Sequence, residues 1–92
     1  MEIELVCFSA VWCGPCRAMK PVIDLIEMEN PDIHVKRIDI NDDKQMEHYT
    51  DSKIAAVPTF LIIADNKQHA KLVGVQSKAT LLKSIAEAKE SF

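Results

Sequence analysis

Glycine is scarce in this sequence, with two residues among 92. A loop that cradles phosphate groups needs several glycines in a short stretch, so Gly14 and Gly74 predict no phosphate site of that kind. Excess positive charge is also lacking, because 11 basic and 14 acidic side chains give a net charge of −3. A binder of nucleic acid or of an anionic membrane would show the opposite balance, so we expect neither partner.

A long hydrophobic run is absent as well. The first apolar stretch, residues 5–8, follows acidic residues and is far too short for a signal peptide or a membrane span. We therefore expect a cytoplasmic protein. The length and an apolar content of 48% predict one domain over residues 1–92, and we expect a monomer.

Cysteine is limited to Cys7, Cys13 and Cys16, which cannot all pair within one chain and so argue against a secreted disulfide scaffold. Two cysteines three positions apart indicate redox chemistry or metal binding instead. A structural zinc site needs four ligands, and no second pair of Cys or His at ligand spacing completes one. We expect no metal and no bound cofactor.

Apolar periodicity predicts strands that alternate with helices. The expected strands cover residues 3–8, 33–40, 59–64 and 70–73, and the expected helices cover 15–29, 43–53 and 78–92. A helix between the first two strands makes them parallel, and a loop at 65–68 makes the last two antiparallel. The sequence therefore predicts an α/β fold of order β-α-β-α-β-β-α, with a mixed four-stranded sheet flanked by three helices.

Two of these elements carry specific patterns. In the second strand, Ile33 and Val35 share one parity while Ile38 and Ile40 share the other, which predicts a bulge or a later start. The last helix, which Ser77 can cap, is expected to line one apolar face with four residues: Leu81, Leu82, Ile85 and Phe92.

The segment Cys13-Gly14-Pro15-Cys16 lies where the first strand passes into the first helix. The free N–H groups and the dipole at a helix N-terminus favour negative charge and lower the pKa of a thiol. Cys13 is therefore expected to attack a substrate disulfide, and Cys16, one turn further in and more buried, to resolve the mixed disulfide. A purely structural disulfide is the alternative.

Together with Trp12, this segment resembles the active site of the thioredoxin family, and the resemblance covers nearly the whole chain. It also rests on these residues, in the family's order and approximate spacing: Phe8-Ser9-Ala10, Pro21, Val57-Pro58-Thr59 and Gly74. It implies a thioredoxin-like fold and dithiol–disulfide exchange on protein substrates, with electrons from a separate reductase.

The resemblance implies further that Pro58 is cis and faces the cysteines. The Val57 backbone would pair with an extended substrate. The rim of this shallow groove would be formed by three residues: Trp12, Ala56 and Gly74. Simpler interpretations make Pro58 a strand-initiating proline, Trp12 a core aromatic and Gly74 a turn residue.

Two features depart from the family. Only twelve residues precede Cys13, too few for the N-terminal strand and helix of full thioredoxins, so a sheet edge should be less covered. Cys7 stands where thioredoxins usually carry a buried aspartate near the resolving cysteine. Three hypotheses follow for this position. Cys7 is a small core side chain; or Cys16 must lose its proton without help from a carboxylate; or Cys7 is an alternative disulfide partner of Cys16. Either Lys36 or Arg37 corresponds to the family's buried lysine.

These observations predict a thiol–disulfide oxidoreductase that reduces protein disulfides through Cys13 and Cys16. Glycine and proline between the cysteines resemble the reductases of the family, whereas oxidases and isomerases often carry histidine there. A disulfide oxidase or isomerase is one alternative, and a non-catalytic binding module is another.

Overall fold

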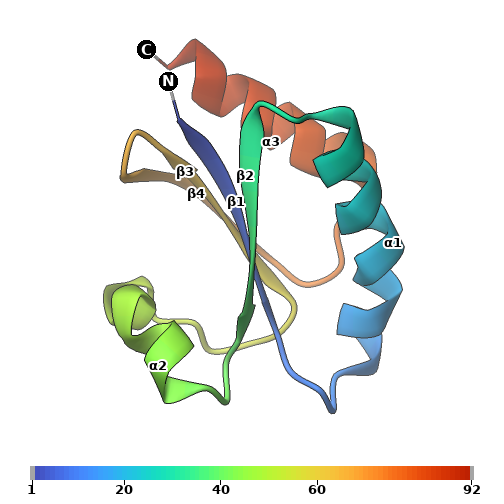
Figure 1. The fold of residues 1–92 in the computed structure, drawn as a ribbon, viewed down its shortest axis with the longest axis vertical. Helices are drawn as coiled ribbons and strands as arrows, with labels where there is room; N and C mark the ends of the chain where they lie inside the picture. Colours follow the sequence, from blue (N-terminus) through green and yellow to red (C-terminus); the bar gives the residue numbers. More distant parts are fainter. Residues whose placement is uncertain (1, 92) are drawn as a thin grey trace.

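The chain folds into one mixed sheet with helices on both of its faces, and the computed structural model describes residues 2–91 (Figure 1). The expected order of elements is confirmed, and the third strand matches its predicted bounds. The elements are β1 (Ile3–Ser9), α1 (Gly14–Glu29), β2 (Ile33–Asp39), α2 (Asp43–Met46), the 3₁₀ helix η1 (Glu47–Ser52), β3 (Thr59–Ala64), β4 (Lys67–Val73) and α3 (Lys78–Glu90). Phe92, expected on the last helix, lies outside the described residues.

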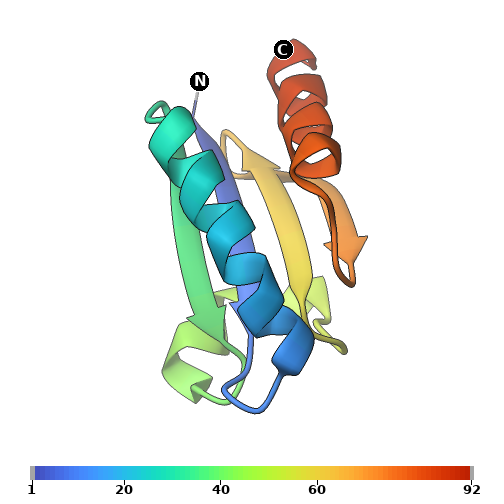
Figure 2. The same cartoon turned by 90° about the vertical axis from the view of Figure 1, so that its right-hand side faces the viewer.

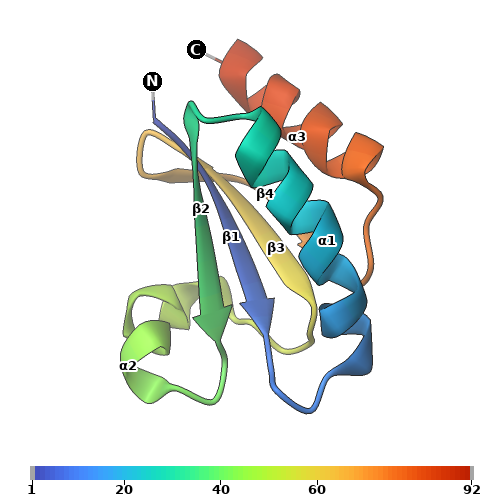
Figure 3. The same cartoon turned by 45° about the vertical axis from the view of Figure 1, so that its right-hand side comes forward.

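The strands lie in the order β2-β1-β3-β4, so β1 and β3 are central and β2 and β4 are the edges (Figure 3). β1 is parallel to β2 and antiparallel to β3, and β4 is antiparallel to β3, as expected. Helices α1 and α3 cover one face of the sheet, and α2 and η1 lie on the other (Figure 2). None of the helices in residues 2–91 is long and apolar enough to cross a membrane.

Each face of the sheet has its own apolar cluster. The larger cluster joins the sheet to α1 and α3, and its helix residues are Met19, Ile23, Ile26, Leu81, Ile85 and Ala88. The smaller cluster is built on Val6, Phe8 and Leu61. Tyr49 covers it from η1, with its ring edge-to-face against Phe8 at a centroid distance of 5.1 Å. The sheet is therefore packed on both sides, which explains the continuous apolar run in β3.

The bulge or later start expected in β2 is wrong, because the strand begins at Ile33 and carries no bulge. β2 pairs with β1 in unbroken register from Ile3–Ile33 to Ser9–Asp39. The parity changes because different helices cover the two faces: Ile33 packs in the larger cluster, whereas Ile38 packs against the smaller one. The register shift lies instead between β3 and β4, at Ile62 and Ile63.

The hairpin between β3 and β4 is tighter than the sequence predicts. Its turn consists of Asp65 and Asn66, both at positive φ (48° and 67°), the conformation that suits a two-residue turn between twisted strands. β4 consequently begins at Lys67 rather than at residue 70. The second helix also differs, because it divides into α2, capped by the Asp42 carboxylate, and the 3₁₀ helix η1.

Candidate active site

The cysteine pair lies at the N-terminus of α1, directly after the turn that follows β1. Cys13 is the N-cap residue, and its N–H donates to the carbonyl of Ala10 at 3.0 Å. Pro15 stands in the first turn, where its missing N–H costs nothing. Cys13 and Cys16 are joined by a disulfide, and their Cα atoms are 5.3 Å apart. The helix start thus holds both sulfur atoms within bonding distance.

The Cys13 sulfur lies in a polar environment that the helix start provides. The backbone N–H of Cys16 donates to Cys13 Sγ at 3.2 Å. A hydrogen bond of this kind, together with the helix dipole, stabilises a thiolate more than a thiol. The geometry therefore suits Cys13 as the sulfur that carries negative charge when the disulfide opens.

The expectation that Cys16 is more buried than Cys13 is wrong for the disulfide form. Cys13 is 4% exposed, whereas Cys16 is only half-buried. Cys13 is the N-cap residue of α1, while Cys16 lies on the wall of a cavity. Trp12, beside them, is 65% exposed, so the interpretation of Trp12 as a core aromatic is wrong.

The residues expected to line the groove come from two loops that hydrogen bonds hold together. The Val57–Pro58 bond is cis, as the resemblance implies. The N–H of Gly74 donates to the Pro58 carbonyl at 2.8 Å, which joins the loop before β3 to the end of β4. The buried hydroxyl of Thr59 donates to the Ala56 carbonyl at 2.7 Å. Gly74 adopts a φ of 90°, which a residue with a Cβ would adopt only with strain.

Pro58 also lines the cavity on the side of Cys16. This cavity, of about 390 Å³, lies between α1 and the sheet, and its wall is mainly apolar. Its lining includes Cys7, Cys16, Met19, Arg37, Pro58 and Phe60. The sequence analysis did not predict this cavity, because its walls come from four segments far apart in the chain.

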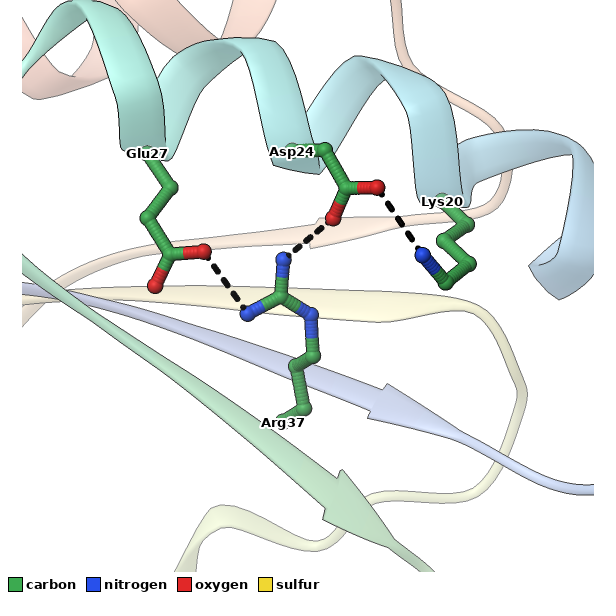
Figure 4. Close-up of polar contacts among 4 residues, drawn as sticks. All are labelled: Lys20, Asp24, Glu27 and Arg37. Carbon is green, nitrogen blue, oxygen red and sulfur yellow. Dashed lines mark hydrogen bonds and ion pairs between the residues drawn. The ribbon is translucent and has the colours of Figure 1, made fainter.

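Arg37, and not Lys36, is the basic residue of β2 that faces this cavity. Arg37 reaches from β2 to α1, where its guanidinium bonds Asp24 at 2.8 Å and Glu27 at 3.2 Å (Figure 4). Lys36 points to the opposite face and pairs with Glu4. The alternation of side chains along β2 decides between the two.

These charges act on two nearby groups. Burial raises the pKa of the Cys7 thiol to about 12, although the positive charge of Arg37 works in the other direction. Cys7 is therefore a neutral thiol at physiological pH, buried at 8% exposure. The hydrogen bond from Lys20, followed by the charges of Lys20 and Arg37, holds the pKa of Asp24 below its usual value. Within residues 2–91, no group of three or more His, Cys, Asp or Glu side chains could hold a metal ion.

A cysteine pair at the N-terminus of the helix after a central strand, next to a cis proline, defines a thiol–disulfide oxidoreductase. The comparisons with known proteins give the family. The sequence matches the thioredoxin family over residues 1–87. The chain belongs to the thioredoxin family, and its activity is that of a protein-disulfide reductase.

Individual relatives agree with this assignment. The chain is 34% identical over 85 residues to a thioredoxin of Mycolicibacterium smegmatis. The matched region covers 91% of this chain and 76% of the relative. It is 40% identical over 81 residues to mitochondrial thioredoxin O of Oryza sativa subsp. japonica, covering 88% of this chain and 45% of that one. Among solved structures, thioredoxin f from spinach chloroplast superposes with a TM-score of 0.84 at 28% identity, over 95% of this chain and 70% of that one.

Proposed function

We propose that Cys13 is the attacking thiol and Cys16 the resolving thiol in the reduction of protein disulfides. The observation that carries this assignment is the N-cap position of Cys13, whose sulfur accepts a hydrogen bond from the Cys16 N–H. The same contact is available to a Cys13 thiolate once the disulfide is reduced. Cys16 lacks that position, since it lies inside the helix.

The reaction consists of two exchanges. The Cys13 thiolate attacks one sulfur of the substrate disulfide, forms a mixed disulfide and releases the other substrate sulfur as a thiolate. Cys16, after losing its proton, attacks Cys13 Sγ, so the mixed disulfide breaks and the second substrate sulfur leaves. The substrate gains two electrons and two protons, and the chain ends with the Cys13–Cys16 disulfide. A separate reductase returns these electrons.

The groove beside the dithiol is proposed to bind an extended segment of the substrate. The segment 56–58 and Gly74 form a single unit, because the Gly74 N–H bonds Pro58. Trp12 supplies an exposed aromatic surface next to Cys13. Three exposed apolar side chains lie in or next to these loops: Val11, Val73 and Val75. A monomeric state and a cytoplasmic location stay predictions, and one relative is named as mitochondrial.

A trapping experiment tests the assignment of the two cysteines. In Cys16→Ser the resolving thiol is missing, so the mixed disulfide with a protein such as insulin should accumulate through Cys13. The matched variant Cys13→Ser should trap nothing and should lose turnover. Trapping through Cys16 in the Cys13→Ser variant, with none through Cys13 in the Cys16→Ser variant, would reverse the two roles, and equal trapping in both variants would overturn the assignment.

The direction of electron flow is tested by the reduction potential of the pair. The chain is equilibrated in graded thiol–disulfide buffers, and its free thiols are then trapped and counted. A potential well below that of the glutathione pool supports a reductase, and one well above it favours an oxidase or isomerase. If no two-electron transition is seen, the binding-module alternative gains support.

A further inference from the structure

We propose that Gln76 is a positioning residue that holds one wall of the substrate groove in its binding shape. The inference rests on the proposed function, because it concerns the groove used by protein substrates. Gln76 follows Gly74 in the connection between β4 and α3 and is half-buried. Its side chain contacts no reacting atom, so it acts through the backbone of its neighbours.

The amide of Gln76 donates to two successive carbonyl groups. Gln76 Nε2 lies 3.0 Å from the carbonyl oxygen of Val73 and 3.3 Å from that of Gly74. The N–H of Gly74 in turn donates to the Pro58 carbonyl at 2.8 Å. A continuous set of hydrogen bonds therefore connects Gln76 to the loop next to the dithiol.

Apart from the Gly74–Pro58 hydrogen bond, this segment has no regular secondary structure to fix it, so such a side chain matters. β4 is an edge strand that ends at Val73, and α3 begins only at Lys78. Gly74, at a φ of 90°, brings the greatest backbone freedom of any residue to the turn. A Cβ placed on Gly74 would meet no atom within 4 Å, so no side chain packs against the turn on that side. The side-chain amide of Gln76 holds this turn, because it donates a hydrogen bond to the carbonyl groups of both Val73 and Gly74.

The side chains on this wall are those that a substrate would contact. Val73 and Val75 flank Gly74 and are 57% and 61% exposed. When the turn is fixed, the two apolar side chains and the Gly74 backbone keep one relative position. A wall fixed in advance spares the substrate part of the ordering cost of binding. Gln76 should therefore lower KM for substrates long enough to reach the groove wall, and leave the chemical step unchanged.

The test compares a protein disulfide with a small one. Insulin reaches the groove wall, whereas the small aromatic disulfide of Ellman's reagent reacts at the dithiol with little groove contact. Gln76→Glu has nearly the same shape as glutamine but cannot donate, and its carboxylate faces two carbonyl oxygens. We expect KM for insulin to rise about three- to tenfold, the range for one lost hydrogen bond to a polar group, with kcat unchanged. The rate with the small disulfide and the reduction potential should stay as in the wild type.

Two variants control for charge and for the loss of glutamine itself. Gln76→Lys restores a donor, and a lysine already bonds two carbonyls in this fold, where Lys71 Nζ contacts Ser52 and Lys53. Its KM should return close to the wild-type value. Gln68→Glu makes the same change of charge at the start of β4 and should leave KM unchanged.

The possible outcomes separate this proposal from the proposed function. An unchanged insulin KM in Gln76→Glu, in a chain that reduces insulin, overturns the role of Gln76 alone. Equal losses with insulin and with the small disulfide overturn it too, because they indicate general damage. If Gln76→Glu does not fold, Gln76→Ala removes the donor without adding charge and must show the same selective rise in KM. A wild-type chain that reduces neither disulfide overturns both proposals.

Discussion

Cys7 and Arg37 lie directly opposite each other on the parallel strands β1 and β2, and both face the cavity that Cys16 lines. The guanidinium lowers the pKa of the Cys7 thiol, but burial has the larger effect and raises it to about 12. The carboxylates of Asp24 and Glu27 hold the Arg37 guanidinium. Both carboxylates belong to α1, so the charge of Arg37 is fixed relative to the helix that carries the dithiol. Cys7 is thus a neutral thiol beside a fixed cation.

The first prediction concerns the reactivity of Cys7. Its pKa is about three units above the ordinary 9.0, so its thiolate fraction near neutral pH is about 10³-fold smaller than that of an exposed cysteine. In the reduced chain, iodoacetamide should modify Cys13 and leave Cys7 intact until the protein is denatured. After oxidation by diamide, peptide mass spectrometry should find the Cys13–Cys16 bridge and no bridge to Cys7. Rapid modification of native Cys7, or a Cys7–Cys16 bridge, would contradict this.

The same shift predicts a loss of stability at alkaline pH. The folded pKa of Cys7 is raised, so between pH 9.0 and about 12 the unfolded chain releases a proton that the folded chain keeps. The free energy of unfolding should therefore fall as pH rises through this window, by up to about tenfold in the equilibrium constant per pH unit. Cys7→Ala should lack this part of the slope in urea unfolding measured from pH 8 to about pH 11. Parallel curves for the two chains would show that the thiol ionises equally in both states.

Replacing Cys7 by aspartate tests whether resolution proceeds without a carboxylate. The described lining of the cavity contains no carboxylate and no histidine beside Cys16. A carboxylate at position 7 would lie opposite Arg37, whose charge favours its ionised form, and it could take the proton of Cys16. We expect faster decay of the mixed disulfide near neutral pH, toward the lower end of the about 10²- to 10⁴-fold range of general bases.

The matched control is Cys7→Asn, because asparagine has nearly the same shape as aspartate but no group that can take a proton. Stopped-flow measurement of resolution should rank aspartate above both asparagine and the wild type, with the difference disappearing at acidic pH. If aspartate and asparagine give the same rate, the identity of residue 7 does not limit resolution.

The ion pairs drawn in Figure 4 predict a contribution to the free energy of unfolding that is lost at low pH. The pKa of Asp24 is lowered below its ordinary value of 3.8, chiefly by its hydrogen bond with Lys20. The stabilisation is therefore present above pH 3.8 and is lost as pH falls through the lower, folded pKa. Asp24→Asn should lower the urea midpoint slightly at neutral pH, and less in high salt, because the pairs are exposed. A difference that persists in strong acid would point to packing rather than charge.

Local patterns in the sequence predict much of this fold. β3 is identified from one continuous apolar run, since both of its faces are buried. The N-terminus of α1 follows from Pro15, and that of α3 from Ser77, whose hydroxyl accepts from the Thr80 N–H. In each case the signal lies within a few residues of the structure that it specifies.

The features that could not be predicted depend on residues far apart in the chain. The parity change in β2 becomes clear only when α1 is known to cover Ile33, and η1 to lie on the side of Ile38. The exposure of Cys16 depends on a cavity whose wall includes Phe60, more than forty positions away. Gln76 stood in a loop with no motif around it, and its role is visible only from the carbonyls that it bonds.

The central position of β1 has a consequence for the order of folding during synthesis. Of the four described strands β1 is made first, yet its two neighbours are β2 and β3, so its second edge stays open until residue 64 has been made. The dithiol follows β1 immediately and is synthesised long before the Pro58 loop that completes its groove. A nascent chain that ends between these segments would expose both a strand edge and a reactive thiol. The sheet is therefore completed late, and the site is complete only when β4 has paired with β3.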